Sequence, residues 1–419
     1  MNVDDVRPQL VCEVMDEQFG TLGYLVIDRV LANAAIGGIR LAPNVTVEEV
    51  ACLARAMTLK CSFLNLWIGG AKAGITAPES LIAARRREVL EAFGRGLGPI
   101  LRTGLYIAGE DLGISAEDLD IVLQSAGLPK VAVRTDSAYY TGLTVVETIR
   151  QALVSRKGSL PTSTVAIEGF GRVGSNVAAL LVSEGARIVA VSTCEGAIYN
   201  RGGLDVEQLI ALRRVHGDHF VTEDIGAKKL DLADLLLLDV NILVPCARPW
   251  TISSRNATQL RADMVIPGGN IPVTPSAERV LFNRDILYMP DFVANCGGVL
   301  AASMVAKGFL RGDIQSVIGT EFAWKVARIL EKGQASDLMP SEIAREVAWQ
   351  NFQRITWQID REERGIRALV QKAFQKGARA SLERGATLLY DRGLLRWNWV
   401  HRLALADTRK ALCADQPLT

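Results

Sequence analysis

Residues 163–192 read STVAIEGFGRVGSNVAALLVSEGARIVAVS, and this stretch decides the fold of the chain. TVAIE predicts a strand, GFGRVG a glycine-rich turn, NVAALLVSEG a helix and RIVAVS a second strand. Gly169, Gly171 and Gly174 have the G-x-G-x-x-G spacing in the strand–turn–helix context that a dinucleotide site requires. They permit a tight turn, close approach of the backbone to a pyrophosphate, and packing of the helix on the strand. The alternative is a strand–helix turn whose glycines are only structural.

The second strand leaves the identity of the dinucleotide open. An acid at its end would hold an adenine-ribose hydroxyl, but the end reads Ser192, Thr193 and Cys194, with Glu195 next. The lack of an acid at the tip itself removes repulsion against a 2′-phosphate, for which Arg201 is a possible partner. We therefore expect NAD or NADP.

Strand and helix patterns extend on both sides of this stretch. Further strands are predicted at 23–31, 106–113, 240–247, 262–269 and 285–292. Helices are predicted at 46–65, 78–97, 141–156 and from about residue 298 onward. Thr46 followed by Glu49 has the pattern of a capping box. The alternation predicts an α/β protein in which helices cover both faces of a parallel sheet.

The length of 419 residues favours two domains. We expect an N-terminal α/β domain for substrate binding and oligomerisation over residues 1–140. A Rossmann-type dinucleotide-binding domain is expected over 141–330, and C-terminal helices over 331–419 that pack between the domains or back on the first.

Composition excludes several classes of protein. Lys plus Arg number 47 and Asp plus Glu 46, a net charge of +1 that gives no reason to expect nucleic acid or an anionic membrane as partner. No apolar run reaches the roughly 18 residues of a membrane span, and the first residues, MNVDDVRPQL, do not resemble a signal peptide. The seven cysteines form no CxxC pair, which favours reduced thiols in a cytoplasmic protein. With three histidines, we expect no metal site.

Residues 68–75, IGGAKAGI, place Lys72 in a collar of glycine and alanine. Small neighbours let the backbone approach a ligand closely. An apolar collar disfavours the ammonium form and lowers the pKa of a lysine. The sequence therefore predicts either a functional lysine in a loop or a glycine-rich turn carrying a solvated one.

Seven motifs in order resemble the glutamate/leucine/phenylalanine/valine dehydrogenases, which oxidatively deaminate L-amino acids. They are AIGGIR (35–40), MTLKCSFLNLWIGGAKAGI (57–75), GEDLG (109–113), Thr141-Gly142, PCA (245–247), GGNIPVTPSA (268–277) and PDFVANCGGV (290–299). The resemblance implies that Lys72 and Asp111 are catalytic, since a lysine with a lowered pKa can activate water against an iminium ion. Asp111 would exchange a proton with the substrate nitrogen, and Lys60 would bind the α-carboxylate. Thr141-Gly142 corresponds to the start of the inter-domain helix.

The resemblance also implies which residues contact the cofactor and the substrate. On the cofactor side these are Thr141, Gly169, Phe170, Gly171, Arg172, Val173, Gly174, Thr193, Cys246, Ala247, Asn270 and Asn295. On the substrate side they are Lys60, Ile36, Gly37, Gly38 and Ala302.

Two positions bear on the substrate. The family's glutamate enzymes hold the side-chain carboxylate with a lysine just before the GG pair and with a later serine, where this chain has Ile36 and Ala302. Neither can neutralise a buried carboxylate, so we expect an apolar or aromatic substrate side chain. Ser303 could restore a hydroxyl if the register shifts by one residue. Chain length and the MTLKCS stretch are closer to the glutamate enzymes, and Ala73 and Pro267 depart from the family pattern.

The alternatives are a glutamate enzyme with a rebuilt side-chain site and a catalytically silent paralogue that binds nucleotide. Retention of Lys60, Lys72 and Asp111 speaks against the silent paralogue. The resemblance implies a homo-oligomer, hexameric or octameric. The tail from residue 396, with Trp397 and Trp399, has no recognised counterpart; these tryptophans suit a core edge or a subunit contact.

Overall fold

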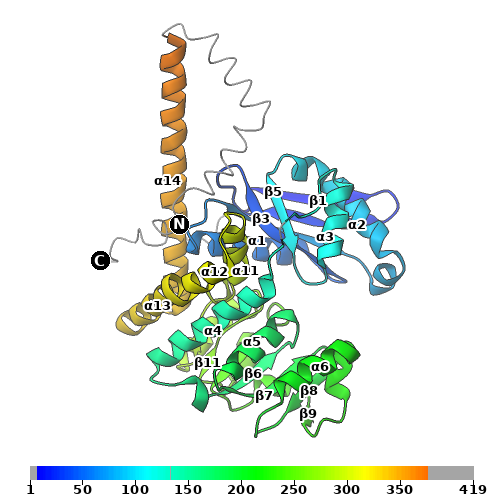
Figure 1. Ribbon diagram of the computed structural model, residues 1–419, viewed down its shortest axis with the longest axis vertical. Coiled ribbons are helices and arrows are strands. Elements are labelled where there is room, and N and C mark those ends of the chain that lie inside the picture. Colours follow the sequence, from blue (N-terminus) through cyan, green and yellow to red (C-terminus); the bar gives the residue numbers. More distant parts are fainter. Residues whose placement is uncertain (1–6, 133, 376–419) are drawn as a thin grey trace. The chain divides into compact units, whose positions relative to one another are not determined.

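The computed structural model describes residues 7–132 and 134–375 of the chain. They form two compact units, one from the residues before 133 together with those from Val347 onward, and one from residues 134–346. Each unit contains its own sheet (Figure 1). The prediction of a two-domain α/β protein whose C-terminal helix returns to the first domain is confirmed. The tail from residue 396 lies outside the described residues.

The first unit is built on a mixed sheet with strand order β1-β2-β4-β3-β5. β1, β2 and β4 pair antiparallel in turn, whereas β4, β3 and β5 run parallel. The strands are β1 Leu10–Asp16, β2 Gly20–Ile27, β3 Ala35–Ala42, β4 Gly69–Thr76 and β5 Tyr106–Glu110. β1 was not predicted, and the strand expected at 23–31 begins earlier and ends at Ile27.

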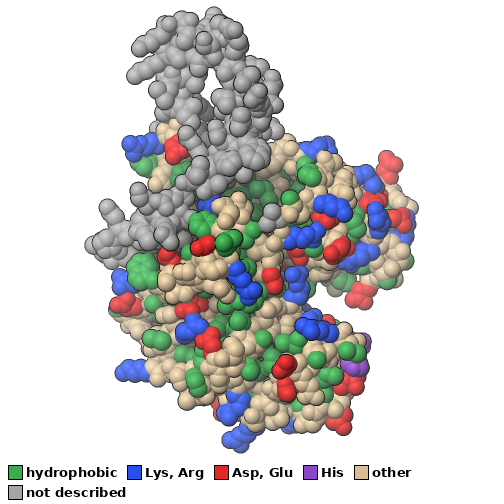
Figure 2. Space-filling view, in the orientation of Figure 1, with side chains coloured by type: hydrophobic (Ala, Val, Ile, Leu, Met, Phe, Trp, Pro, Cys, Tyr) green, Lys and Arg blue, Asp and Glu red, His purple; other side chains and the backbone are tan. Residues whose placement is uncertain are grey.

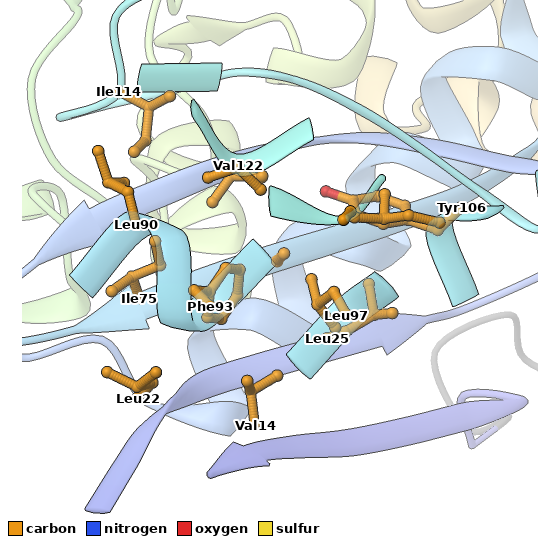
Figure 3. Packing of buried hydrophobic residues seen from close by; sticks show 14 of the residues in the cluster. Val14, Leu22, Leu25, Ile75, Leu90, Phe93, Leu97, Tyr106, Ile114 and Val122 are labelled. Atoms are coloured by element: carbon orange, nitrogen blue, oxygen red, sulfur yellow. The ribbon is translucent and has the colours of Figure 1, made fainter. Parts of the chain in front are cut away.

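Alternation along β2 assigns the two faces of this sheet. Leu25 packs in the main core with residues of α2 and α3 (Figure 3), and Ile27 belongs to the same core. Val26 instead packs with Val50 and Ala54 of α1. Side chains of a strand point alternately to opposite faces, so α1 covers one face and α2 and α3 the other. The helices are α1 Val47–Phe63, α2 Glu79–Arg102 and α3 Ala116–Ser125.

The start of α1 differs from the predicted capping box in one half. Thr46 Oγ1 accepts a hydrogen bond from the Glu49 backbone N–H at 3.2 Å, as expected. The Glu49 carboxylate, however, pairs with the guanidinium of Arg40 on β3. A charged partner on the sheet has replaced the backbone N–H that a capping box would use.

Lys72 does not lie in a loop, as the sequence suggested, but in the interior strand β4. The small residues that look like a turn are there because α1 and the neighbouring strands approach closely. A Cβ at Gly70 would lie 2.1 Å from the Thr58 backbone nitrogen, and one at Gly74 2.5 Å from Val45 Cγ1. Glycine in a strand often marks such an approach.

The second unit contains a seven-stranded sheet with order β12-β11-β10-β6-β7-β8-β9. The strands from β12 to β7 are parallel, as predicted, but β8 and β9 are antiparallel because the chain reverses after Thr193 and forms a hairpin. The strands are β6 Thr164–Glu168, β7 Arg187–Thr193, β8 Gly196–Tyr199, β9 Lys228–Leu230, β10 Ile242–Pro245, β11 Met264–Val265 and β12 Leu287–Tyr288.

The remaining helices are α4 Ser137–Ser155, α5 Arg172–Ser183, α6 Val206–His216, α7 Leu232–Leu236, α8 Ser254–Ala257, α9 Pro275–Asn283, α10 Asp291–Ala294, α11 Gly297–Val305, α12 Arg311–Val317, α13 Ala323–Ser336 and α14 Pro340–Gln375. α4 begins four residues before the expected Thr141-Gly142, because Asp136 caps it by accepting from the Tyr139 N–H at 3.1 Å. Thr141-Gly142 therefore lies within the second turn.

Two further features concern the described residues as a group. Among them, no helix combines the length and apolarity needed to cross a membrane, and no group of three or more His, Cys, Asp or Glu is arranged to hold a metal. Basic and acidic side chains are interspersed on the face seen in Figure 2, as the balance of charges predicts.

Candidate active site

Three neighbouring strands, β4, β3 and β5, bring the candidate catalytic groups together on the first sheet. Ala71 and Ala73 of β4, and Ile39 and Leu41 of β3, belong to the core on the α2–α3 side. By strand alternation, Lys72 and Arg40 point to the opposite face, which α1 covers. Asp111 follows β5 at the carboxyl end of the strand next to β3.

Lys72 and Asp111 form an ion pair, with the amine 3.0 Å from Oδ2 of the carboxylate. Lys72 is 3% exposed. Burial lowers the pKa of Lys72; Asp111 opposes that shift, and the charges of Arg40 and Lys60 reinforce it. Burial alone would raise the pKa of Asp111, but Lys72 and Arg40 outweigh it and lower the pKa to about 2. The site thus holds an ionised carboxylate beside a lysine that is easier to deprotonate than a free one.

Arg40 is a member of this cluster that the sequence did not indicate. Its Nε donates to Asp111 Oδ2 at 3.0 Å, and its Nη1 pairs with Glu49. Arg40 is the last residue of AIGGIR, and the sequence prediction assigned roles only to Ile36, Gly37 and Gly38 of this motif. The only local signal was a charged side chain on the same strand face as Gly38 and Ile36, two and four residues away.

The substrate-side glycines are required by close packing. A Cβ at Gly37 would lie 1.7 Å from the Ala71 carbonyl oxygen, and one at Gly38 would lie 2.8 Å from Asp111 Cβ. Gly38 therefore lets the segment that carries Asp111 approach β3. Ile36 is partly buried on the same strand, and Lys60 is buried in the last turn of α1.

In the second unit, the glycine-rich turn links β6 to α5 as predicted. Gly169 has φ +96°, a backbone conformation that favours glycine. A Cβ at Gly174 would lie 2.0 Å from the Gly169 carbonyl oxygen, so this glycine allows α5 to pack against the turn. Phe170 is buried, and its ring packs at 5.5 Å from that of Phe220.

The turn fits a dinucleotide pyrophosphate. A Cβ at Gly171 would meet no atom within 4 Å, so the space beside this residue is open. Gly171 is the N-cap of α5, and no side chain caps the helix there. Arg172, Val173 and Gly174 form the first turn of α5, whose backbone N–H groups and positive partial charge suit phosphate oxygens.

Glu168, another residue absent from the sequence prediction, joins this turn to the loop after β10. It is 6% exposed and ends β6; its Oε2 accepts from the Ala247 N–H at 3.2 Å. Burial raises the pKa of Glu168, and the Ala247 N–H and Arg248 only partly offset that rise. Cys246 is packed beside Gly268, and burial raises the pKa of its thiol.

The side chains of Asn270, in the loop after β11, and Asn295, directly after α10, contact each other. The Asn295 amide nitrogen donates to the Gly269 carbonyl at 2.7 Å and lies 3.1 Å from Asn270 Oδ1. Its own Oδ1 is buried and has no hydrogen-bond partner among the described residues. An unsatisfied buried acceptor of this kind suits a donor from a ligand, such as a carboxamide.

The tip of β7 has a second carboxylate beside it that its own residues did not suggest. The Thr193 hydroxyl donates to the Asp218 carbonyl at 2.8 Å, and the Cys194 thiol lies 3.7 Å from both Glu195 Oε1 and Asp218 Oδ2. Asp218 comes from the turn Gly217–Thr222, too distant in sequence to be foreseen. Arg201 is not at this tip, because it follows Tyr199, which pairs with Ala190 three residues back along β7.

α11 packs closely on α4 through two glycines. A Cβ at Gly297 would lie 1.9 Å from the Tyr140 carbonyl oxygen, and one at Gly298 would lie 3.1 Å from Thr141 Oγ1. Ala302 is partly buried on α11. Ser303, the possible replacement hydroxyl, donates to the Leu300 carbonyl at 2.8 Å.

Two protein-family models match the sequence of this chain, one in each unit. The model of the Glu/Leu/Phe/Val dehydrogenase dimerisation domain matches residues 12–126, and that of Glutamate/Leucine/Phenylalanine/Valine dehydrogenase matches residues 134–308. The glutamate dehydrogenase of Thermotoga maritima is 35% identical over 297 residues, which cover 66% of this chain and 70% of that protein.

The chain belongs to the Glu/Leu/Phe/Val dehydrogenase family. The NADP-specific glutamate dehydrogenase of Synechocystis sp. is 33% identical, over 63% of this chain and 67% of that one. The solved hetero-hexameric glutamate dehydrogenase of Thermus thermophilus, in its Leu-bound form, aligns with a TM-score of 0.71 at 25% identity, covering 84% of this chain and 90% of that one.

Family membership fixes the general activity. The protein is an NAD(P)-dependent amino-acid dehydrogenase, an oxidoreductase that acts on CH–NH2 groups. The family match confirms the identification made from the seven motifs and the expectation of NAD or NADP.

Proposed function

We propose that this dehydrogenase interconverts an L-amino acid with an apolar side chain and its 2-oxo acid plus ammonia. The observation that carries the chemistry is the buried contact between Lys72 and Asp111, 3.0 Å between Nζ and Oδ2. A lysine with a lowered pKa beside an ionised carboxylate provides two proton-accepting groups at one place.

In the first unit, three residues each take part in a defined step of oxidative deamination: Lys60, Asp111 and Lys72. Lys60 binds the substrate α-carboxylate as a cation. Asp111 takes a proton from the substrate ammonium, so that the free amine can support loss of hydride from Cα. Lys72 removes a proton from water as its oxygen attacks the resulting iminium carbon. Asp111 then returns its proton to the nitrogen, which leaves as ammonia. The hydroxyl proton passes back to Asp111 as the carbonyl forms, and Asp111 and Lys72 each release their proton to solvent.

The second unit holds the dinucleotide through Gly169, Gly171, Gly174 and the first turn of α5, with Asn270 and Asn295 at the neighbouring loop. Thr141, Thr193, Cys246 and Ala247 complete the set of proposed contacts. The dinucleotide supplies the acceptor for the hydride that leaves the substrate Cα.

The substrate class follows from Ile36 and Ala302, which stand where the family's glutamate enzymes carry the lysine and the serine that hold the side-chain carboxylate. Neither offers a cation or a donor, and a carboxylate buried without them is strongly disfavoured. The hydroxyl proton of Ser303 is directed to Leu300 of its own helix, so this residue does not supply the missing donor. A branched aliphatic or aromatic side chain meets no such penalty.

A panel of 2-oxo acids with ammonia and NADH or NADPH tests this proposal. We expect 2-oxo-4-methylpentanoate or phenylpyruvate to give a kcat/KM at least tenfold above that of 2-oxoglutarate. The second candidate, a glutamate dehydrogenase, is favoured by the names of the curated relatives. Preference for 2-oxoglutarate would establish it and overturn the apolar pocket.

We also propose that the protein is a homo-oligomer. The match of residues 12–126 to a dimerisation domain supports this, as does the hexameric assembly named for the Thermus thermophilus enzyme. Light scattering coupled to size-exclusion chromatography tests it, and a monomer at micromolar concentration would contradict it.

A further inference from the structure

The arrangement of charges around Asp111 is uneven. Lys72 Nζ and Arg40 Nε both contact the same carboxylate oxygen, Oδ2, each at 3.0 Å. The other oxygen, Oδ1, has no protein partner within residues 7–132 and 134–375. One side of the carboxylate is therefore fixed and the other is available.

Arg40 is itself held from two sides. The residue is 4% exposed on β3, and its second contact is Glu49 in the first turn of α1. Glu49 is in turn tied to the start of the helix through its N–H and Thr46 Oγ1. The Leu41 N–H donates to the Leu112 carbonyl at 2.9 Å, so the backbone after Asp111 is also joined to β3.

We propose that Arg40 is a positioning residue, which with Glu49 holds Asp111 by Oδ2 and leaves Oδ1 to meet the amino group of the substrate. The proposal rests on the amino-acid dehydrogenase function described above. Arg40 thereby contributes to the reaction, whereas Gly37 and Gly38 of the same motif do not.

A second consequence concerns the proton that Lys72 must release. If Lys72 were the sole partner of Asp111, its deprotonation would leave a buried carboxylate without a counter-charge, which is strongly unfavourable. Arg40 keeps a positive charge on the same oxygen, because guanidinium stays protonated throughout the working pH range. Before Asp111 takes the substrate's proton, Lys72 can therefore lose its own proton while Asp111 stays ionised and in place.

The proposal predicts specific kinetic effects of Arg40→Met and Arg40→Lys, measured as pH profiles of L-leucine oxidation with NAD or NADP. Misplacing a reacting group by about 1 Å costs roughly a hundredfold in rate. We expect Arg40→Met to lose about that factor in kcat, with a smaller change in KM. Removing the positive charge raises the pKa of Lys72, so the rising limb of the profile should move to higher pH.

Arg40→Lys should show a smaller pH shift than Arg40→Met, because it keeps the positive charge. A lysine cannot, however, bridge the carboxylates of Asp111 and Glu49. Guanidinium chloride at millimolar concentration should partly restore the rate of Arg40→Ala. Glu49→Gln loosens Arg40 without altering Asp111, and should lower kcat, but less than Arg40→Met does. If the Arg40 variants do not fold, the kinetics of Glu49→Gln test the positioning role of Arg40 instead.

Arg345→Met is the matched control. Arg345 pairs with buried Glu278 at 2.8 Å in the other unit, so its loss also strips an arginine from a buried carboxylate. This variant should lower the melting temperature and leave the pH limb in place.

The proposal fails if folded Arg40 variants keep the wild-type kcat and pH limb, or if Glu49→Gln keeps the wild-type kcat. It also fails if they change only the melting temperature, as Arg345→Met does. A wild type that oxidises no amino acid would instead overturn the proposed function, and the two failures are thereby distinguished.

Discussion

Lys72 and Asp111 contact each other although they lie on different strands and are 39 positions apart, with 3.0 Å between Nζ and Oδ2. Lys72 belongs to β4 and Asp111 follows β5; β3 lies between these strands. The contact is possible because β3 carries glycine at position 38, where a Cβ would come within 2.8 Å of Asp111 Cβ.

Replacing Lys72 by alanine should abolish turnover without preventing folding. Asp111 would keep Arg40 as its counter-charge, so no buried carboxylate is left unpaired. We expect kcat to fall by about 10²- to 10⁴-fold, the usual contribution of a general base. Calorimetric binding of NADH should change less than about twofold. Parallel loss of NADH binding and turnover would indicate a structural lysine.

Gly171→Val and Gly174→Val form a matched pair at the glycine-rich turn. The Gly171 side chain would enter open space, so this variant should fold normally and bind NADH at least about tenfold more weakly, roughly 1.4 kcal/mol. The Gly174 side chain would collide with the Gly169 carbonyl and should lower the melting temperature. Calorimetry and thermal unfolding separate the two effects; unchanged affinity in Gly171→Val would argue against a pyrophosphate at this turn.

Ile36→Lys combined with Ala302→Ser should shift specificity toward an acidic substrate. The new cation and hydroxyl would offer a buried carboxylate the partners that it lacks in the wild type. One such pair is worth on the order of 1–3 kcal/mol, or roughly ten- to a hundredfold in the ratio of kcat/KM for 2-oxoglutarate over 2-oxo-4-methylpentanoate. Ile36→Met with Ala302→Ser is the control without the cation. An unchanged ratio in the lysine variant would remove Ile36 from the pocket wall.

Glu168→Gln should stabilise the protein increasingly as the pH rises. Burial raises the folded-state pKa of Glu168 above its usual 4.5, so between these two values the folded state binds more protons than the unfolded state. The free energy of unfolding therefore falls with pH through that window in the wild type. Glutamine keeps an acceptor for the Ala247 N–H without this loss. The difference in melting temperature between variant and wild type, measured from pH 4 upward, should grow; a constant difference would show that the carboxyl is not perturbed.

Asp218→Asn should raise the kcat/KM for NADPH relative to NADH. Asp218 and Glu195 bring two carboxylates to the tip of β7, where a 2′-phosphate would be repelled. Such exposed charges contribute about 0.5–1 kcal/mol, which corresponds to roughly two- to fivefold. Asp224→Asn is the control, because it removes the same charge at an exposed residue. Equal ratios in both variants would mean that Asp218 does not face the ribose.

The sequence by itself determined the fold class, the family and the position of the dinucleotide turn. The dinucleotide turn depends on an apolar strand, glycines at fixed spacing and a helix within residues 163–192, and the family on short motifs between residues 35 and 299. Such short-range signals are kept on folding, as the Thr46 side-chain cap and the positive φ of Gly169 show. The roles of the individual site residues stay predictions.

Only the tertiary structure showed how the charges are paired. IGGAKAGI has the composition of a turn, yet it is an interior strand, because the space that its glycines leave is filled by α1 and the neighbouring strands. Arg40, Glu168 and Asp218 meet their partners across strands or loops that are 25 to 79 positions apart in sequence. No local period records such contacts, since they depend on strand order and on which face each residue occupies.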